Sequence, residues 1–128
     1  MLNVIAVGAG GFIGAVLRYG AGVLCKNPAM ATGFPVATFC VNVLGSFLIG
    51  LASAYFIKQG NPGGPLQLFI MVGVMGGFTT FSSFSLETIN MLTDGRMGMA
   101  AANVLLSVGL CLLGVWAGRL AGSGLFGA

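Results

Sequence analysis

The stretch GGFTTFSSFSLE, residues 76 to 87, lies at the end of an apolar run long enough to cross a lipid bilayer. Its twelve residues include two adjacent glycines, five hydroxyl side chains, three phenylalanines and one glutamate. Glycine loosens a helix, and a carboxylate at membrane depth costs roughly 3 kcal/mol on insertion scales. A helix that only faces lipid has no use for such a sequence, so this stretch predicts a function beyond anchoring.

The composition of the whole chain is that of an integral membrane protein. Its 128 residues are 57% hydrophobic and 5% charged, whereas a soluble surface needs about a quarter charged residues. A helix needs about 20 mostly apolar residues to span the hydrocarbon. The start of the chain lacks the basic region and cleavage site of a removable signal peptide, so we expect the first helix to be retained. We predict an all-α protein, a single domain over residues 1–128, with four transmembrane helices near Val4–Leu24, Val36–Ile57, Leu66–Leu92 and Ala100–Leu120.

Several kinds of chemistry are excluded by the residues that the chain lacks. It has no histidine, which excludes histidine metal sites and histidine acid-base catalysis. Cys25, Cys40 and Cys111 lie in or beside the expected spans, where cysteine usually packs as a small apolar residue. We therefore expect neither a disulfide nor a metal cluster. The net charge of +3 is too small and too scattered to indicate nucleic-acid binding.

The basic residues are divided evenly between the two sides of the membrane. With four spans, Lys58 and Arg119 lie on the side of the termini, and Lys26 and Arg96 lie on the other. Orientation follows lysine and arginine bias in short loops, and this even division predicts insertion in both orientations and antiparallel pairing. The alternative is that Arg119 or the membrane-embedded Arg18 tips the balance toward one orientation.

Small residues recur at four-residue spacing, which lines one helix face and lets backbones approach closely. Four helices also leave little interior in which one chain could bury Arg18, Asn42 and Glu87. We therefore expect a homo-oligomer. The small-residue pairs are Gly10 and Gly14, Ser46 and Gly50, Gly73 and Gly77, and the series Gly114, Gly118 and Gly122.

Three polar residues in the spans each allow a structural and a functional interpretation. Arg18, beside Tyr19, is either a snorkelling anchor or a positive charge facing an aqueous vestibule. Asn42 either hydrogen-bonds a neighbouring helix or offers its NH₂ group to a dehydrated anion. Ser107 either bonds back to its own helix or lines a polar path.

Gly76 and Gly77, followed by two β-branched threonines, form a weak place in the third helix. We predict that this helix is broken near Gly76–Thr80. Freed carbonyl groups there would suit a small hard cation such as Na⁺. The neighbouring hydroxyls either satisfy the broken backbone groups or form a polar track for an ion; they belong to Thr79, Thr80, Ser82, Ser83 and Ser85.

Phe81 and Phe84 are three residues apart, so on a helix they lie about 60° apart in rotation and ~4.5 Å apart along the axis. A phenylalanine pair at this spacing is ordinarily core packing. Aromatic ring edges carry positive quadrupole density, so the same pair beside hydrogen-bond donors could also hold a small anion.

Three motifs in the right order give the chain its resemblance to a known family. Residues Gly10–Tyr19, Val41–Gly50 and Gly76–Ser85 resemble the first-, second- and third-helix motifs of the Fluc (CrcB-type) fluoride channels. The third motif is long and highly specific, and the resemblance covers nearly the whole chain.

The resemblance implies a passive fluoride-selective channel in a bacterial inner membrane, which exports fluoride and lowers its toxicity. It implies an antiparallel homodimer with two pores and a structural Na⁺ between the subunits. Phe81 and Phe84 would present ring edges to fluoride, Asn42 its amide, and Ser107 part of the polar lining. By the same resemblance, the pore hydroxyls are those of Thr80, Ser82, Ser83 and Ser85, the charges at the vestibule or pore end are Arg18 and Glu87, and the Na⁺ ligands are the carbonyls of Gly76 and Thr79.

Two other classes of membrane protein compete with the channel. A small proton-coupled drug exporter would use Glu87 as its membrane carboxylate, but such exporters carry their glutamate in the first helix, and here that helix has none. A structural or assembly protein would leave the hydroxyl-rich stretch unexplained. Proton dependence separates the exporter from the channel, and absence of flux would favour the structural protein.

Overall fold

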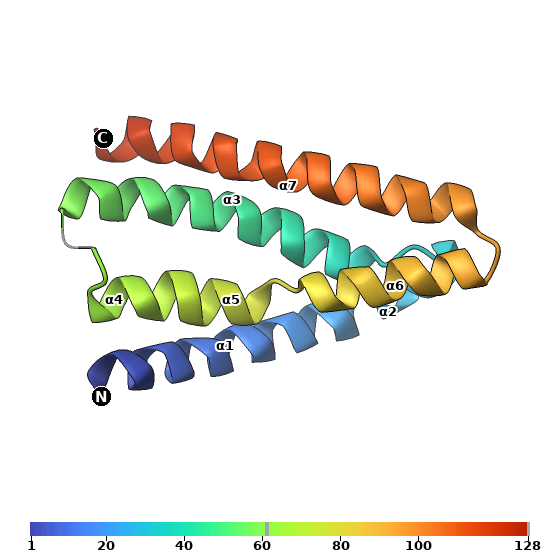
Figure 1. Ribbon diagram of the computed structural model, residues 1–128, viewed down its shortest axis with the longest axis horizontal. Coiled ribbons are helices and arrows are strands. Elements are labelled where there is room, and N and C mark those ends of the chain that lie inside the picture. Colours follow the sequence, from blue (N-terminus) through green and yellow to red (C-terminus); the bar gives the residue numbers. More distant parts are fainter. Residues whose placement is uncertain (61, 128) are drawn as a thin grey trace.

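The structure, a computed structural model, describes residues 1–60 and 62–127. Over these residues all regular structure is helical, and four segments are long and apolar enough to cross a membrane, as predicted. They are α1 (Leu2–Leu24), α3 (Val36–Gln59), the composite segment Pro65–Thr93 and α7 (Met97–Phe126). The four run along the long axis of the molecule, and the start of α1 and the end of α7 lie at the same end of it (Figure 1). The chain is an all-helical, multi-pass membrane protein.

The third span is built from several helical pieces. It comprises α4 (Pro65–Gln67), the π-helical η1 (Leu68–Val74), α5 (Met75–Phe78) and α6 (Phe81–Thr93). Thr79 and Thr80 separate α5 from α6, and their backbone is extended, with ψ of 158° and 116°. Both glycines of the Gly76-Gly77 pair lie inside α5, so the two non-helical residues are the threonines that follow them.

Glycine contacts hold the helices at close range in two pairs. Gly10 and Gly14 of α1 lie against η1 and α5, where a Cβ atom on Gly73 would come within 2.8 Å of the Gly10 Cα. Gly118 of α7 meets the backbone of α3 in the same way: a Cβ atom there would lie 2.9 Å from the Leu51 nitrogen. The small-residue spacing thus marks the packed faces, as expected.

A short helix, α2 (Lys26–Thr32), fills much of the segment between the first two spans, where the sequence suggested only a connection. A proline at its third residue is compatible with a helix, because the first turn leaves its N–H groups without intrahelical partners. Gly33 ends α2 with φ of +68°, a left-handed conformation that favours glycine.

The last span extends beyond its expected end near Leu120. α7 continues to Phe126 and stops at Gly127, whose φ is +65°. Its final turn is tied to α3, because Lys58 Nζ donates to the Phe126 carbonyl.

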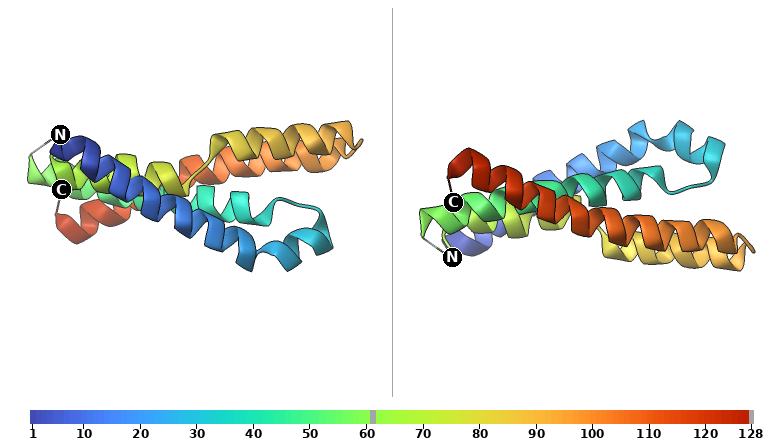
Figure 2. Two further views of the ribbon diagram at one scale, coloured as in Figure 1. Left: turned by 90° about the horizontal axis from the view of Figure 1, so that it is seen from below. Right: turned by 90° about the horizontal axis from the view of Figure 1, so that it is seen from above.

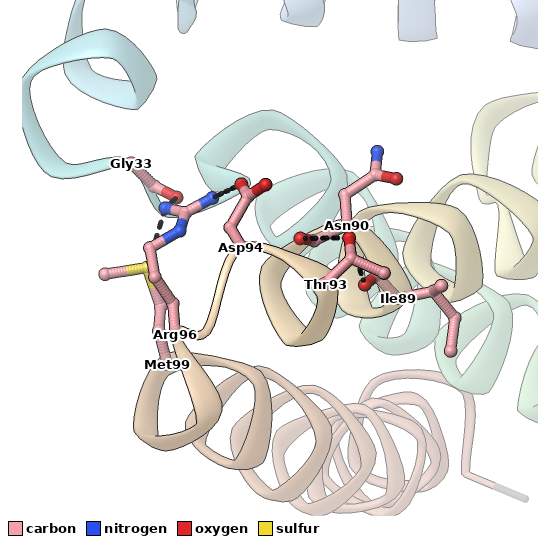
Figure 3. Close-up of polar contacts among 7 residues, drawn as sticks. All are labelled: Gly33, Ile89, Asn90, Thr93, Asp94, Arg96 and Met99. Atoms are coloured by element: carbon pink, nitrogen blue, oxygen red, sulfur yellow. Dashed lines mark hydrogen bonds and ion pairs between the residues drawn. The ribbon is translucent and has the colours of Figure 1, made fainter.

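At the opposite end of the molecule, α6 and the start of α7 diverge from the end of α1 and from α2 (Figure 2). Arg96, just before α7, bridges this divergence by donating to the Gly33 carbonyl at 2.9 Å (Figure 3). The same guanidinium pairs with Asp94 at 3.2 Å. The two connecting loops at this end are therefore held together by one side chain.

Candidate functional site

A cavity of about 420 Å³ opens beside the extended residues Thr79 and Thr80. It brings together residues from three of the four spans that the sequence singled out separately. Asn42 comes from α3, the threonines and phenylalanines from the third span, and Ser107 from α7. The candidate pore and cation-site residues that line it are Asn42, Thr79, Thr80, Phe81, Phe84 and Ser107, and Ser46 of α3 lines it as well. The rest of the wall is mostly apolar and includes Ile49, Met75, Val108, Cys111 and Leu112.

The side-chain amide of Asn42 forms hydrogen bonds with both the N–H and the carbonyl of Thr80. Its Oδ1 accepts from the Thr80 N–H at 2.7 Å, and its Nδ2 donates to the Thr80 carbonyl at 2.9 Å. The side chain thus replaces the helical partners that Thr80 lacks in an extended conformation. One of the two Nδ2 hydrogens is used in this pairing. The second is the donor that Asn42 can offer to the cavity.

Thr80 also forms the N-terminal cap of α6. Its Oγ1 accepts from the Ser83 N–H at 3.2 Å and donates to Ser83 Oγ at 3.1 Å. Ser82 Oγ lies within hydrogen-bond distance of the same oxygen, at 3.2 Å. Ser85 donates to the Phe81 carbonyl at 2.9 Å, within its own helix. Ser82, Ser83 and Ser85 do not line the cavity. The free N–H of Ser83 is thus capped by Thr80, the hydroxyls of Ser82 and Ser83 bond to this cap, and that of Ser85 bonds to its own helix, which is the structural interpretation of the hydroxyl-rich stretch.

The two phenylalanine rings lie together but differ in their surroundings. Their centroids are 5.3 Å apart and their planes are tilted by 41°. Phe84 is 8% exposed and packed within the chain, whereas Phe81 is 76% exposed. Phe81 thus lines the cavity and also faces the outside of the single chain.

The carbonyl of Gly76 lacks the partner that a continuous helix would give it. That partner would be the Thr80 N–H, which donates to Asn42 instead. The Thr79 N–H and Oγ1 both donate to the Met75 carbonyl, at 3.0 and 2.9 Å. Gly76 is exposed on the surface of the chain, and a Cβ atom there would meet nothing within 4 Å. Freed carbonyl oxygens of this kind are hard ligands and fit a small alkali cation.

Arg18 and Glu87 lie outside the cavity lining. Glu87 Oε1 accepts from the Thr38 hydroxyl at 2.7 Å, while its Oε2 is buried without a hydrogen-bond partner among the described residues. Arg18 is half-buried on α1. The structure of the single chain does not bring these two charges into the cavity around Asn42.

Asn103 and Thr88 are polar residues that the sequence reasoning did not single out. Asn103 on α7 is 1% exposed and donates to Thr88 Oγ1 of α6 at 2.9 Å. It also accepts from the Ser107 hydroxyl at 3.3 Å. The available signal was the spacing of Asn103 and Ser107, four residues apart, which places both on one face of a helix.

Comparisons with known proteins point to the same family that the three sequence motifs resemble. The sequence model of a family described as "CrcB-like protein, Camphor Resistance (CrcB)" matches residues 5–119. A protein of Elusimicrobium minutum is 54% identical over 112 residues, which cover 88% of this chain and 86% of the relative. One of Ruminiclostridium cellulolyticum is 46% identical over 120 residues, 94% of this chain and 92% of the relative. Both relatives bear the name "Fluoride-specific ion channel FluC".

Proposed function

The chain belongs to the CrcB-like family, and from this we propose that it is a passive fluoride-selective channel through which fluoride leaves a bacterial cell across the inner membrane. Its role would be to lower fluoride toxicity. As a member of a family of ion channels, it is not an enzyme. The observation that carries the proposal is the cavity in which Asn42, Phe84 and Ser107 converge beside the helix interruption.

The cavity offers what a small dehydrated anion needs in a medium of low dielectric constant. Leaving water costs an ion several kcal/mol unless fixed donors replace its hydration shell. The second Nδ2 hydrogen of Asn42 and the hydroxyl of Ser107 are neutral donors, so they attract the anion without binding it as tightly as a cation would. The edges of Phe81 and Phe84 add weak positive density on an otherwise apolar wall. The hydroxyls of Ser82, Ser83 and Ser85 would continue the path.

We propose that the working unit is an antiparallel homodimer with two pores. The high exposure of Phe81 supports this, because a residue of the proposed pore then lies on the outside of a single protomer, where a second copy can cover it. The even division of Lys26 and Arg96 against Lys58 and Arg119 supports insertion in both orientations. Arg18 and Glu87 would lie at the vestibule or pore ends of this dimer.

We further propose that the carbonyls of Gly76 and Thr79 hold a structural Na⁺ between the two subunits. The extended Thr79–Thr80 backbone supports this site, because the Gly76 carbonyl loses its helical donor there. A bound cation would supply positive charge and link the two copies of the interruption. The oxygen ligands come from backbone, so substitution of side chains alone leaves the ligands in place.

Purified protein in liposomes tests the function directly. We expect rapid fluoride release once a potassium ionophore cancels the charge that each ion carries, and little chloride release under the same conditions. The measurement is efflux followed with ion-selective electrodes. Equal rates for the two halides would contradict the selectivity, and release driven only by a proton gradient would indicate an exporter.

A reporter fused after the last residue tests the orientation. We expect it on both sides of the membrane for the natural sequence. Three lysines added to the loop around residues 59–64 should shift it to the cytoplasmic side, because that loop lies on the side of the termini. If the reporter of the natural sequence is already on one side only, dual topology is wrong.

The Na⁺ site predicts a dependence of dimer stability on the cation. In a constant total salt concentration of Na⁺ plus K⁺, the melting temperature of the detergent-solubilised dimer should rise with the Na⁺ fraction, because a ligand that binds only the folded state stabilises it. A ligand at 100 times its Kd adds about 2.7 kcal/mol. Identical melting curves in pure Na⁺ and pure K⁺ would argue against the site.

A further inference from the structure

A chain of buried hydrogen bonds leads from the cavity wall into the contact between α6 and α7. Ser107 Oγ donates to Asn103 Oδ1, Asn103 Nδ2 donates to Thr88 Oγ1, and Thr88 Oγ1 donates to the Phe84 carbonyl at 2.7 Å. All four residues are buried in the protomer; Asn103 and Ser107 are 1% and 5% exposed. Of the four, Ser107 and Phe84 line the cavity, while Asn103 and Thr88 stand behind it.

Which atom donates in each of these hydrogen bonds follows from the donors and acceptors that each side chain has. The single proton of Thr88 goes to the Phe84 carbonyl, so the Thr88 oxygen must accept from the neighbouring amide. This fixes the Asn103 NH₂ group toward Thr88 and its carbonyl oxygen toward Ser107. An amide oxygen only accepts, so the single proton of Ser107 must be donated to Asn103.

Ser107 therefore meets the cavity with its proton already engaged. The bond to Asn103 is long, 3.3 Å against a usual value of about 2.7–2.8 Å for O–H···O. When the Ser107 hydroxyl rotates about its Cβ–Oγ bond, it can donate its hydrogen bond to an anion in the cavity. Asn103 Oδ1 then loses its hydrogen-bond donor. A buried acceptor without a partner opposes the exchange.

We propose that Asn103 is a positioning residue that weakens fluoride binding by competing with the ion for the proton of Ser107. The inference rests on the proposed function and assigns a role to a residue that does not touch the cavity. Conduction needs sites that bind well enough for entry and weakly enough for exit. Asn103 weakens the binding enough for exit, because its Oδ1 accepts the Ser107 hydrogen bond again when the ion moves on. This competition shortens the time that fluoride stays at Ser107.

Asn103→Leu removes the competitor and keeps the number and branching of the side-chain heavy atoms. The Ser107 proton then has only its own helix backbone, already bonded, as a poorer local acceptor, and fluoride should bind more tightly. Single-channel conductance in planar bilayers at rising fluoride concentration is the measurement. We expect the half-saturating concentration to fall by roughly two- to tenfold, the equivalent of one neutral hydrogen bond, and the maximal conductance to fall because exit is slower. A purely structural role would lower conductance without lowering the half-saturating concentration.

Thr88→Val gives a second variant in case Asn103→Leu folds poorly. Without the Thr88 hydroxyl, the NH₂ group of Asn103 has no acceptor on that side, and buried N–H groups are less often left unpaired than carbonyls. The amide should rotate and donate to Ser107 Oγ, which frees the serine proton for the ion. The half-saturating concentration should therefore fall here too. Thr93→Val is the matched control, because Thr93 is exposed and its hydroxyl donates to the carbonyls of Ile89 and Asn90 in its own helix (Figure 3).

Ser107→Ala decides whether the effect passes through Ser107. In that background, Asn103→Leu and Thr88→Val should leave the half-saturating concentration unchanged. The proposal would be overturned if the half-saturating fluoride concentration is unchanged or raised in a folded single variant. It would also be overturned if the concentration shifts equally in the Ser107→Ala background. Either result would leave the proposed channel function standing, provided that the natural protein conducts fluoride. Absence of fluoride flux in the natural protein would instead overturn the proposed function.

Discussion

Asn42→Asp should abolish fluoride efflux almost completely while the protein still elutes as a dimer. The substitution nearly preserves volume but replaces the NH₂ donor at the cavity wall with a carboxylate oxygen. Two like charges about 4 Å apart repel by about 4 kcal/mol at the effective dielectric constant of partly buried sites, which is roughly a thousandfold in ion occupancy. Liposome efflux in fluoride is the measurement.

The structure explains why Asn42→Asp should still fold. One carboxylate oxygen still accepts from the Thr80 N–H, while the Thr80 carbonyl loses its donor and faces the other carboxylate oxygen instead. That loss costs about 1–3 kcal/mol, which size-exclusion elution and melting in detergent would detect. Asn90→Asp is the matched control, because Asn90 is exposed on α6 and the charge change is the same (Figure 3). Full efflux in Asn42→Asp would mean that Asn42 only supports the backbone.

Phe81→Ile is expected to reduce fluoride efflux to near the background of empty liposomes. If Phe81 only filled space, this apolar replacement would be mild, since apolar swaps that change volume little usually cost less than ~1.5 kcal/mol. If its ring edge holds fluoride, isoleucine removes the quadrupole and flux falls while the fold remains. Phe84→Met should act in the same direction, with a larger effect on melting, because Phe84 is buried within the chain and Phe81 is not.

Phe12→Ile is the comparison for Phe81→Ile, because Phe12 on α1 is 72% exposed and does not line the cavity. It should retain most of the efflux. Dimer elution has to be normal in each variant, since a lost dimer would explain lost flux trivially. Natural-sequence efflux in Phe81→Ile would remove Phe81 from the proposed pore.

The sequence predicted those features that depend on local composition. Hydropathy over about 20 residues locates the four spans, and the glycine spacing in α1 and α7 locates their packed faces, because both signals repeat within one helix. The end of α7 was placed too early, because Gly122 and Gly124 stay helical: Gly122 packs against Leu51 and Ala54 of α3, and the helix ends only at Gly127.

Long-range pairings could not be read in the same way. Asn42 and Thr80 are 38 residues apart. Their hydrogen bonds depend on how far α3 and the third span are shifted along each other, and local composition does not determine this register. The same holds for Asn103 and Thr88, which meet only because α6 packs along α7. Each amide was visible in the sequence, but its partner was not.

The extended pair Thr79–Thr80 also divides one helix dipole into two. The helical run that ends at Phe78 presents its negative end to the interruption, and α6 presents its positive end, each equivalent to roughly half an elementary charge. The N–H groups of Phe81 and Ser82, which lack intrahelical partners, form this positive end and point toward the interruption. Two adjacent residues thus create fields of opposite sign within one span, so a cation beside the Gly76 carbonyl and an anion beside Phe81 are each favoured by the backbone. An uninterrupted helix over residues 65–93 would cancel both fields in its interior.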